Sequence, residues 1–257
     1  MPHLGACRLC LEQKELQESH YICSALYPKK TTLEFLGRRS VSRNAQHIKA
    51  PLLCWDCEQL FARNGESEVL LRIAPKIARK GAFPLYDKLR VAWPREDALS
   101  LKRYAGYEVG LDMDKFAYFM LSLVWRGAVH AWPDGEGGVC KPLPLGEFSE
   151  PIRRYLLGQA DFPPNTSVIV IVCSDELSRR AWFLPTELWE ANCLNFRFLA
   201  FGVFFRAMMG KNIPQFYRDA SCMAPQKWIA MGDCERRTRE TLDWLESMRA
   251  TSVQFSA

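Results

Sequence analysis

The sequence has no long apolar run and no export signal. A membrane-spanning helix needs about 18–20 consecutive apolar residues, and the nearest candidate, Phe196–Met209, is interrupted by Arg197 and Arg206. A second apolar stretch, Phe116–Trp125, is too short to cross a bilayer. The opening residues, MPHLGACRLC, lack the apolar run behind a basic segment that marks a signal peptide. We therefore expect a soluble, cytoplasmic protein.

The chain also lacks internal repeats, low-complexity segments and the polar bias of a disordered protein. Of its 257 residues, 48% are hydrophobic and 12% are aromatic, which is enough to bury a substantial core. This length suits one large domain or two domains of ordinary size.

Charge of one sign is not in large excess, because the net charge is only +5. Its distribution is uneven: residues 1–110 hold 18 Lys and Arg against 12 Asp and Glu, whereas the remainder holds 16 against 17. A net charge of +6 in the first part suits a nucleic-acid partner or an ordinary solvated surface. Composition leaves both readings open.

Cysteine is present in number, with ten residues. We do not expect disulfides, because the chain can build its own core and has no export signal. Four cysteines form two Cys-x-x-Cys pairs, CRLC at 7–10 and CWDC at 54–57. The other six stand alone, which is typical of small buried hydrophobic side chains. They are Cys23, Cys140, Cys173, Cys193, Cys222 and Cys234.

The two pairs predict a structural zinc site. A Cys-x-x-Cys turn delivers two thiolates from one knuckle, and two such turns supply the four ligands of a tetrahedral Zn²⁺ site. The 43 residues between the pairs can carry a hairpin that brings them together. The favoured ligands are Cys7, Cys10, Cys54 and Cys57. A competing set replaces the second pair with His20 and Cys23, and it would leave His20 unavailable for catalysis.

Periodicity and turn residues predict a mixed set of elements. Strands are expected in residues 32–37, 86–94, 167–173, 179–184 and, as a pair, 193–210. Helices are expected from the second cysteine pair to residue 66, and over Ser67–Lys80, Asp112–Trp132, 148–158 and Asp233–Arg249. We therefore predict an α+β fold, in which residues 1–80 form a zinc module and residues 81–110 a connection. Residues 111–257 then form an α+β domain with a small sheet of three to five strands and covering helices.

The order of knuckle, hairpin and second cysteine pair at a helix start resembles a treble-clef zinc finger. Within that group the text CRLC, ESHYI and LLCWDCE is similar to the four-cysteine HNH endonucleases. Their pattern is a cysteine pair, an acidic residue and His followed by Ile-Ile-Pro, and a second pair followed by His or Asn. The resemblance covers residues 7–66, a quarter of the chain.

The resemblance implies site roles for several residues. His20 becomes the general base that activates water against a phosphodiester, and Glu58 stands where the family holds a catalytic Mg²⁺ or Mn²⁺ ion. Asn64 and Glu66, further along the same helix, are alternates for Glu58. Asn44 or His47 would orient the site from the hairpin.

The sequence departs from the family pattern at three places. Ser19 replaces the acidic residue before the histidine, residues 21–23 read Tyr-Ile-Cys instead of Ile-Ile-Pro, and Glu58 replaces His or Asn. A site with one carboxylate fewer should bind its metal ion more weakly. His20 also has a plainer reading as a zinc ligand or as a hairpin side chain bonded to backbone.

Basic residues punctuate the region between the cysteine pairs. Lys and Arg on a hairpin beside a zinc finger could neutralise phosphates, with DNA more expected than RNA, or could form a plain solvated surface. They are Lys29, Lys30, Arg38, Arg39, Arg43 and Lys49.

Two further features lie in the second part. Arg126 and His130 stand four apart on the predicted central helix, where we place both at the polar margin, although a buried Arg126 would need an acidic partner. Cys173, Ser174 and Asp175 follow a buried strand, but they lack the flanking glycines of a nucleophile elbow.

The sequence thus supports two hypotheses. The first is an HNH-like, metal-dependent endonuclease with a structural zinc, of a kind that suits bacterial defence. The second is a non-catalytic zinc module that binds nucleic acid or a partner protein, with the C-terminal domain as a further interaction surface.

Overall fold

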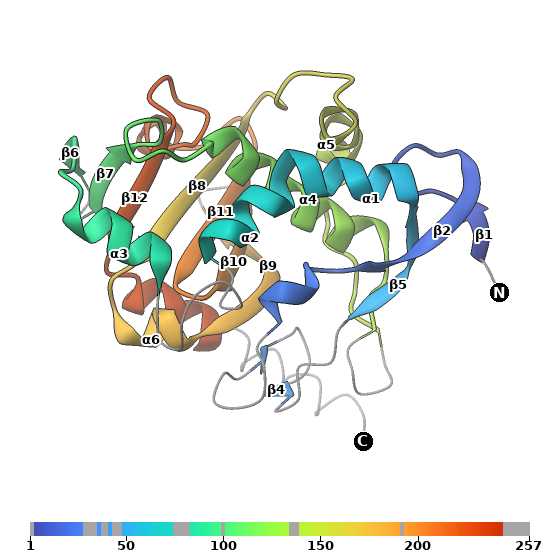
Figure 1. Ribbon diagram of the computed structural model, residues 1–257, viewed down its shortest axis with the longest axis horizontal. Helices are drawn as coiled ribbons and strands as arrows, with labels where there is room; N and C mark the ends of the chain where they lie inside the picture. The colour runs from blue at the N-terminus through green and yellow to red at the C-terminus, as the bar shows by residue number, and fades with distance from the viewer. Residues whose placement is uncertain are drawn as a thin grey trace.

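The computed structural model describes residues 3–27, 35–36, 41–42, 48–73, 83–98, 101–133, 139–190 and 193–243 (Figure 1). Within these ranges the strands form two sheets, one of three strands near the N-terminus and one of nine. Helices pack on both sheets, so the predicted α+β class is confirmed.

The smaller sheet is antiparallel and has the strand order β1-β2-β5. Its strands are β1 (His3–Ala6), β2 (Gln13–His20) and β5 (Lys49–Cys54), with a 3₁₀ turn, η1 (Ser24–Leu26), after β2. A helical run follows β5 without a break and consists of α1 (Trp55–Phe61), the π-helical turn η2 (Ala62–Glu66) and α2 (Ser67–Ile73). Knuckle, hairpin and helix therefore occur in the order that the treble-clef resemblance implies. We call residues 3–27 and 48–73 the N-terminal unit.

The large sheet has the order β4-β3-β9-β10-β11-β8-β12-β7-β6. Among the described strands of this sheet, only β3–β9 and β8–β12 are parallel neighbours. Five strands come from the predicted C-terminal domain: β8 (Thr166–Cys173), β9 (Trp182–Glu190), β10 (Cys193–Ala200), β11 (Val203–Met209) and β12 (Trp228–Gly232). The other four are β3 (Phe35–Leu36), β4 (Val41–Ser42), β6 (Glu96–Ala98) and β7 (Leu101–Ala105).

The central helix α4 (Met113–Val129) packs on one face of the large sheet. Asp112 caps its N-terminus by accepting a hydrogen bond from the Lys115 N–H at 3.4 Å. Every residue from Phe116 to Gly127 is buried, as a helix covered on all sides requires. The Phe119 ring lies 5.5 Å from that of Phe205 on β11. The predicted core helix is confirmed.

The opposite face of the large sheet has its own cover. Along β8, Val168, Val170 and Val172 face the α4 side. The alternate residues Ile169, Ile171 and Cys173 belong to a separate cluster against which Leu242 packs. A strand that is buried on both faces needs apolar residues at nearly every position. The continuous apolar run SVIVIVC, residues 167–173, therefore predicted this strand correctly.

Smaller helices complete the fold. They are α3 (Pro84–Val91), η3 (Gly146–Phe148), α5 (Ser149–Leu156), α6 (Glu176–Arg180) and α7 (Gln215–Asp219), with further helical turns over residues 235–243.

One sequence-based prediction is wrong. Residues 86–94 were expected to form a strand, but most of them lie in α3. Pro84 in the first turn suits a helix start, and Leu85 and Leu89 are buried four residues apart, which is helical spacing.

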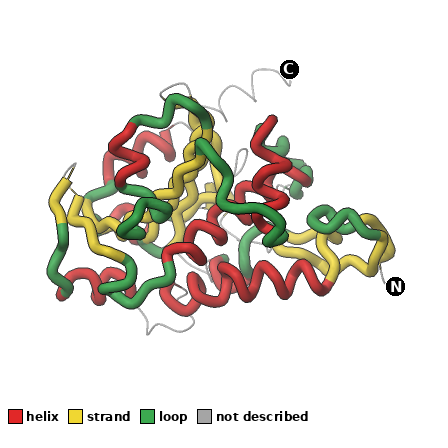
Figure 2. The backbone as a smooth tube through the Cα atoms, turned by 90° about the horizontal axis from the view of Figure 1, so that it is seen from above, coloured by secondary structure: helices red, strands yellow, loops and turns green. Residues whose placement is uncertain are grey.

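The N-terminal unit and the large sheet share one hydrophobic cluster. It runs from Cys7 to Met231 and passes through α4. The ring of Phe61 on α1 meets that of Trp125 on α4 edge-on, with centroids 6.1 Å apart. Figure 2 shows the three-stranded sheet at the N-terminal end of the molecule, with a long helical run leading from it toward the larger part.

Some predictions lie partly outside the described residues. The helices expected over Ser67–Lys80 and Asp233–Arg249 are helical as far as residues 73 and 243, where the described part ends. The domain limits at 80 and 110 stay a prediction. Among the described residues, no helix is both long and apolar enough to cross a membrane.

Candidate metal centre

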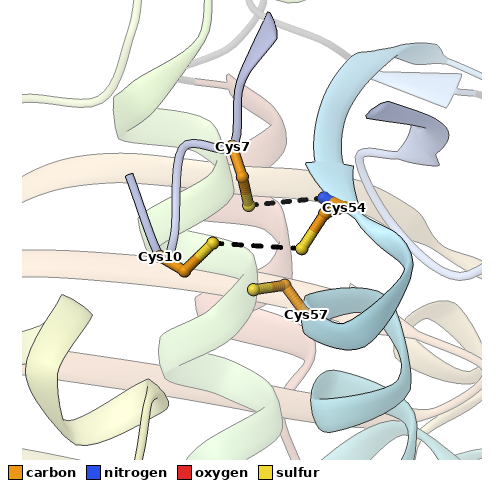
Figure 3. A group of neighbouring side chains, drawn as sticks. All are labelled: Cys7, Cys10, Cys54 and Cys57. Carbon is orange, nitrogen blue, oxygen red and sulfur yellow. Dashed lines mark hydrogen bonds between the residues drawn. The ribbon is translucent and has the colours of Figure 1, made fainter. Parts of the chain in front are cut away.

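Four cysteine side chains converge where the small sheet meets α1. Cys7 and Cys10 stand on the turn between β1 and β2, Cys54 ends β5, and Cys57 lies in the first turn of α1. Figure 3 shows their sulfur atoms pointing toward one another. All four Sγ atoms lie within 4.8 Å of each other.

The first pair sits on a hydrogen-bonded knuckle. The Leu11 N–H donates to the Cys7 carbonyl at 2.8 Å, and the Cys7 N–H donates to the Glu12 carbonyl at 2.9 Å. Leu11 takes a left-handed φ of 67°, which closes the turn tightly. The knuckle is tied to β5 because the Arg8 N–H donates to the Leu52 carbonyl at 3.1 Å. Backbone bonding therefore holds the two thiols in place.

The second pair approaches the first through β5. The Cys54 N–H donates to Cys7 Sγ at 3.3 Å, and Cys10 Sγ lies 3.9 Å from Cys54 Sγ. Four thiolates around Zn²⁺ at about 2.3 Å each would be about 3.8 Å apart. Donor type, donor number and spacing thus fit a structural Zn²⁺ ion held by Cys7, Cys10, Cys54 and Cys57.

The pKa values of Cys7, Cys10 and Cys57 are shifted in different directions. A hydrogen bond with the Cys57 thiol lowers the pKa of Cys7, despite burial, while the same hydrogen bond and burial raise the pKa of Cys57. Burial raises the pKa of Cys10. A bound zinc ion would replace the shared protons, because thiolate is the ligand form.

The geometry favours the four-cysteine set over the competing one. Cys54 pairs with Leu16 across the small sheet, whereas His20 pairs with Lys49. Four residues of strand separate Leu16 from His20, about 13 Å at 3.3 Å per residue. In the described part of the chain, neither His20 nor Cys23 belongs to the ligand group.

A buried charge cluster lies beside the cysteines. Arg126 of α4 is 2% exposed, and its Nη1 lies 2.7 Å from Glu66 Oε1. Its Nη2 lies 3.8 Å from Glu58 Oε2, and the Ser19 hydroxyl donates to Glu58 Oε1. The guanidinium also stacks over Phe61, 4.7 Å from the ring centroid. We call Ser19, Glu58, Glu66 and Arg126 the Arg126 cluster.

Electrostatics in the Arg126 cluster follow from burial. Burial raises the pKa of Glu58, and Arg126 and the Ser19 hydroxyl oppose that rise. Burial alone would lower the pKa of Arg126, but Glu66 and Glu58 outweigh it, so the pKa is raised and the group stays charged. The cation that balances these carboxylates is therefore a side chain of the chain itself.

The HNH-like residues are brought together in part. Ser19 and Glu58, two of the positions at which the sequence departs from the family pattern, hydrogen-bond each other, and His20 follows Ser19 on β2. The His20 ring lies 6.4 Å from that of Tyr27. Asn64 instead hydrogen-bonds the Tyr118 side chain. Burial raises the pKa of Tyr118, and this hydrogen bond partly offsets the rise. Catalytic roles for His20, Glu58 and Asn64 remain predictions.

The predicted phosphate-binding residues are mostly outside the described part of the chain. Lys29, Lys30, Arg38, Arg39 and Arg43 lie there, as do Asn44 and His47. Lys49 is described, and its ammonium group pairs with Glu18.

The placement of Arg126 corrects one sequence-based expectation. It was placed at the polar margin of its helix, but it is buried with two acidic partners, while His130 is partly exposed. The sequence indicated that a buried Arg126 would need an acidic partner, but it did not indicate which residue that partner is. Its partners Glu58 and Glu66 are 60 or more positions away, so no local pattern connects them.

No family model, curated protein or solved structure matches the chain. The four-cysteine cluster is what the structure shows of the predicted resemblance, and the HNH-like assignment stays a prediction.

Proposed function

We propose that the chain is a zinc-stabilised, non-catalytic treble-clef protein that binds nucleic acid through its first part, residues 1–110. The observation that carries the non-catalytic part is the Arg126 guanidinium beside Glu58. Zinc has a structural role here, because four thiolates leave no open coordination position for water or substrate.

The position of Arg126 argues against a second, catalytic ion. Mg²⁺ keeps several waters and demands near-octahedral oxygen geometry. Glu58 Oε2 lies 3.8 Å from the Arg126 guanidinium, which is 2% exposed. A divalent ion at Glu58 would therefore lie beside a fixed positive charge that repels it.

Nucleic acid is the proposed ligand on grounds of charge and exposure. Residues 1–110 carry a net charge of +6, and most of this positive charge comes from residues 28–47 and 74–82, outside the N-terminal unit. Each cysteine turn also presents one suitable side chain to solvent, Arg8 in the first and Trp55, 61% exposed, in the second. An arginine can contact a phosphate and a tryptophan can stack on a base, the combination that single-stranded nucleic acid uses.

The test separates binding from cleavage. Purified protein is incubated with plasmid DNA and with labelled single-stranded and double-stranded DNA, in Mg²⁺ or Mn²⁺, beside His20→Ala. We expect binding that weakens with salt and no cleavage by either protein. The double variant R8A/W55A should lose about 10-fold or more in affinity, given about 1–3 kcal/mol per stacked base.

The matched control is Trp93→Ala. Trp93 follows α3 and is 92% exposed, so its removal tests the loss of an exposed indole away from the zinc turns. If W93A weakens binding as much as R8A/W55A does, the assigned surface is wrong. Absence of any salt-sensitive binding would overturn the choice of ligand.

The endonuclease remains the second candidate. It is favoured by the meeting of Ser19 and Glu58 next to His20 on a strand–strand–helix frame. Metal-dependent cleavage that disappears in His20→Ala would establish it and refute the non-catalytic proposal.

A further inference from the structure

A second group of thiols lies far along the chain from the four-cysteine site. Cys173 ends β8, and Cys234 follows β12 by two residues. These strands are parallel neighbours, with Cys173 opposite Gly232, so their carboxyl ends meet at one edge of the large sheet. Both cysteines are fully buried. The thiols that were expected to be isolated core residues are therefore neighbours.

A carboxylate completes this group. Asp175 lies two residues after β8, and one of its oxygens lies within 4.8 Å of both Cys173 Sγ and Cys234 Sγ. Its Oδ1 accepts from the Ser178 N–H at 2.7 Å, and its Oδ2 accepts from the Cys234 N–H at 2.9 Å. A carboxylate has about four lone-pair sites, so each oxygen keeps one. The two backbone donors orient the carboxylate, as outer hydrogen bonds do for metal ligands.

Hydroxyl groups lie on one side of this group of ligands, and further acidic residues lie on the side toward solvent. Behind the thiols, the Ser178 and Thr238 hydroxyls are hydrogen-bonded at 2.6 Å, which ties α6 to the helical residues 235–243 (Figure 1). Toward solvent, Asp175 also groups with Asp233 and Glu235, which lie within the same 4.8 Å limit. Soft thiols lie inside and acidic groups outside.

We propose that Cys173, Cys234 and Asp175 form a second metal site, which takes Zn²⁺. Two sulfurs and one oxygen are donors that this ion accepts, and a water or Asp233 supplies the fourth. Glu235 is paired with Arg239 at 2.6 Å, so it is the weaker candidate. On binding, Zn²⁺ forms two Zn–S bonds while the two thiol protons leave to solvent. This site is separate from the proposed nucleic-acid function and does not depend on it.

The first test counts zinc in the full chain. Protein purified with zinc and desalted should hold two zinc ions per chain by elemental analysis. Cys173→Ser with Cys234→Ser should halve that content to one, which the four-cysteine site retains. The control is Cys222→Ser, because Cys222 is equally buried on the α4 side of the sheet and belongs to no ligand group among the described residues. It should keep two.

A second measurement uses unaltered protein, so it does not depend on whether a variant folds. X-ray absorption at the zinc edge reports the average number of sulfur ligands. The four-cysteine site alone gives four, whereas equal loading of both sites gives about three. One zinc per chain with four sulfurs would overturn the proposal. So would a Cys173–Cys234 disulfide found by thiol counting and peptide mapping.

Discussion

Arg126 balances the charge of the N-terminal unit at the scale of single residues. Arg126→Met should lower the free energy of unfolding by about 3–5 kcal/mol, because it leaves the partly buried Glu58 and Glu66 without a cation. Arg126→Lys should cost less, since the charge stays but the planar fork that reaches both carboxylates is lost. Denaturant titration in zinc-saturated buffer measures both effects.

Neutralising the partners provides the control. In the triple variant E58Q/E66Q/R126M no charge is left unpaired, so most of the stability lost in R126M should return. If the three substitutions are additive instead, Arg126 does not interact with these carboxylates as described.

Individual residues also show where sequence reasoning works. The four cysteines were predictable because each pair is a local turn whose spacing already specifies a knuckle. The partners of Arg126, and the meeting of Cys173 with Cys234, were not. Both contacts depend on which strands and helices become neighbours in the fold. No short stretch of the sequence determines that.

Among the elements, the contact between η2 and α4 is unusually close. A Cβ on Gly65 would lie 3.0 Å from the Phe119 backbone nitrogen and 3.0 Å from Tyr118 Cδ1. Gly65→Ala should therefore destabilise the protein by about 1–3 kcal/mol, as overpacking does, although alanine is the better helix former. Thermal unfolding with bound zinc measures the loss.

Ser67→Ala is the matched control for this contact. Ser67 begins α2 two residues later and is exposed, so alanine there should change stability by less than about 0.5 kcal/mol. Equal effects at both positions would mean that helix propensity, not the close approach to α4, decides the outcome.

Elements with strong periodicity were predicted well from sequence. The segment 193–210 was read as strands, and it forms the antiparallel pair β10–β11 around a turn at Phe201 and Gly202. Its alternating aromatics and the glycine, at φ 75°, explain the success. The short, mixed segment that forms α3 was misread, because eight residues contain only two turns of evidence.

At the scale of the whole molecule, one core joins both sheets. The hydrophobic cluster includes Cys7, Cys57 and Met231, and Arg153 of α5 donates to the Leu9 carbonyl of the zinc knuckle at 2.6 Å. Chelation of zinc should therefore lower the Tm of a single unfolding transition by roughly 20 °C or more. Structural zinc contributes about 10–16 kcal/mol in finger peptides, and each 1 kcal/mol moves Tm by about 2–4 °C at this size.

Calorimetry with and without chelator checks this, with apoprotein re-loaded with zinc as the control. Two separated transitions, with only one sensitive to the chelator, would show that the N-terminal unit melts independently.

The overall class was predictable, but the extent of the large sheet was not. Strand β3, which lies between the cysteine pairs in sequence, joins β9 by parallel pairing of Phe35 with Trp182. Such a long-range partner is selected by packing and by the free edge of the sheet, not by the pattern of the strand itself. For the same reason four strands of that sheet lie outside the predicted C-terminal domain.

Because Glu58 and Arg126 are far apart in the sequence, they are synthesised at different times. A ribosome delivers both cysteine pairs and both carboxylates of the Arg126 cluster more than fifty residues before it delivers their arginine. Until α4 emerges, the nascent N-terminal unit has its four cysteines but lacks the arginine that pairs with Glu58 and Glu66. Completion of the unit is thus set by the arrival of the middle of the chain.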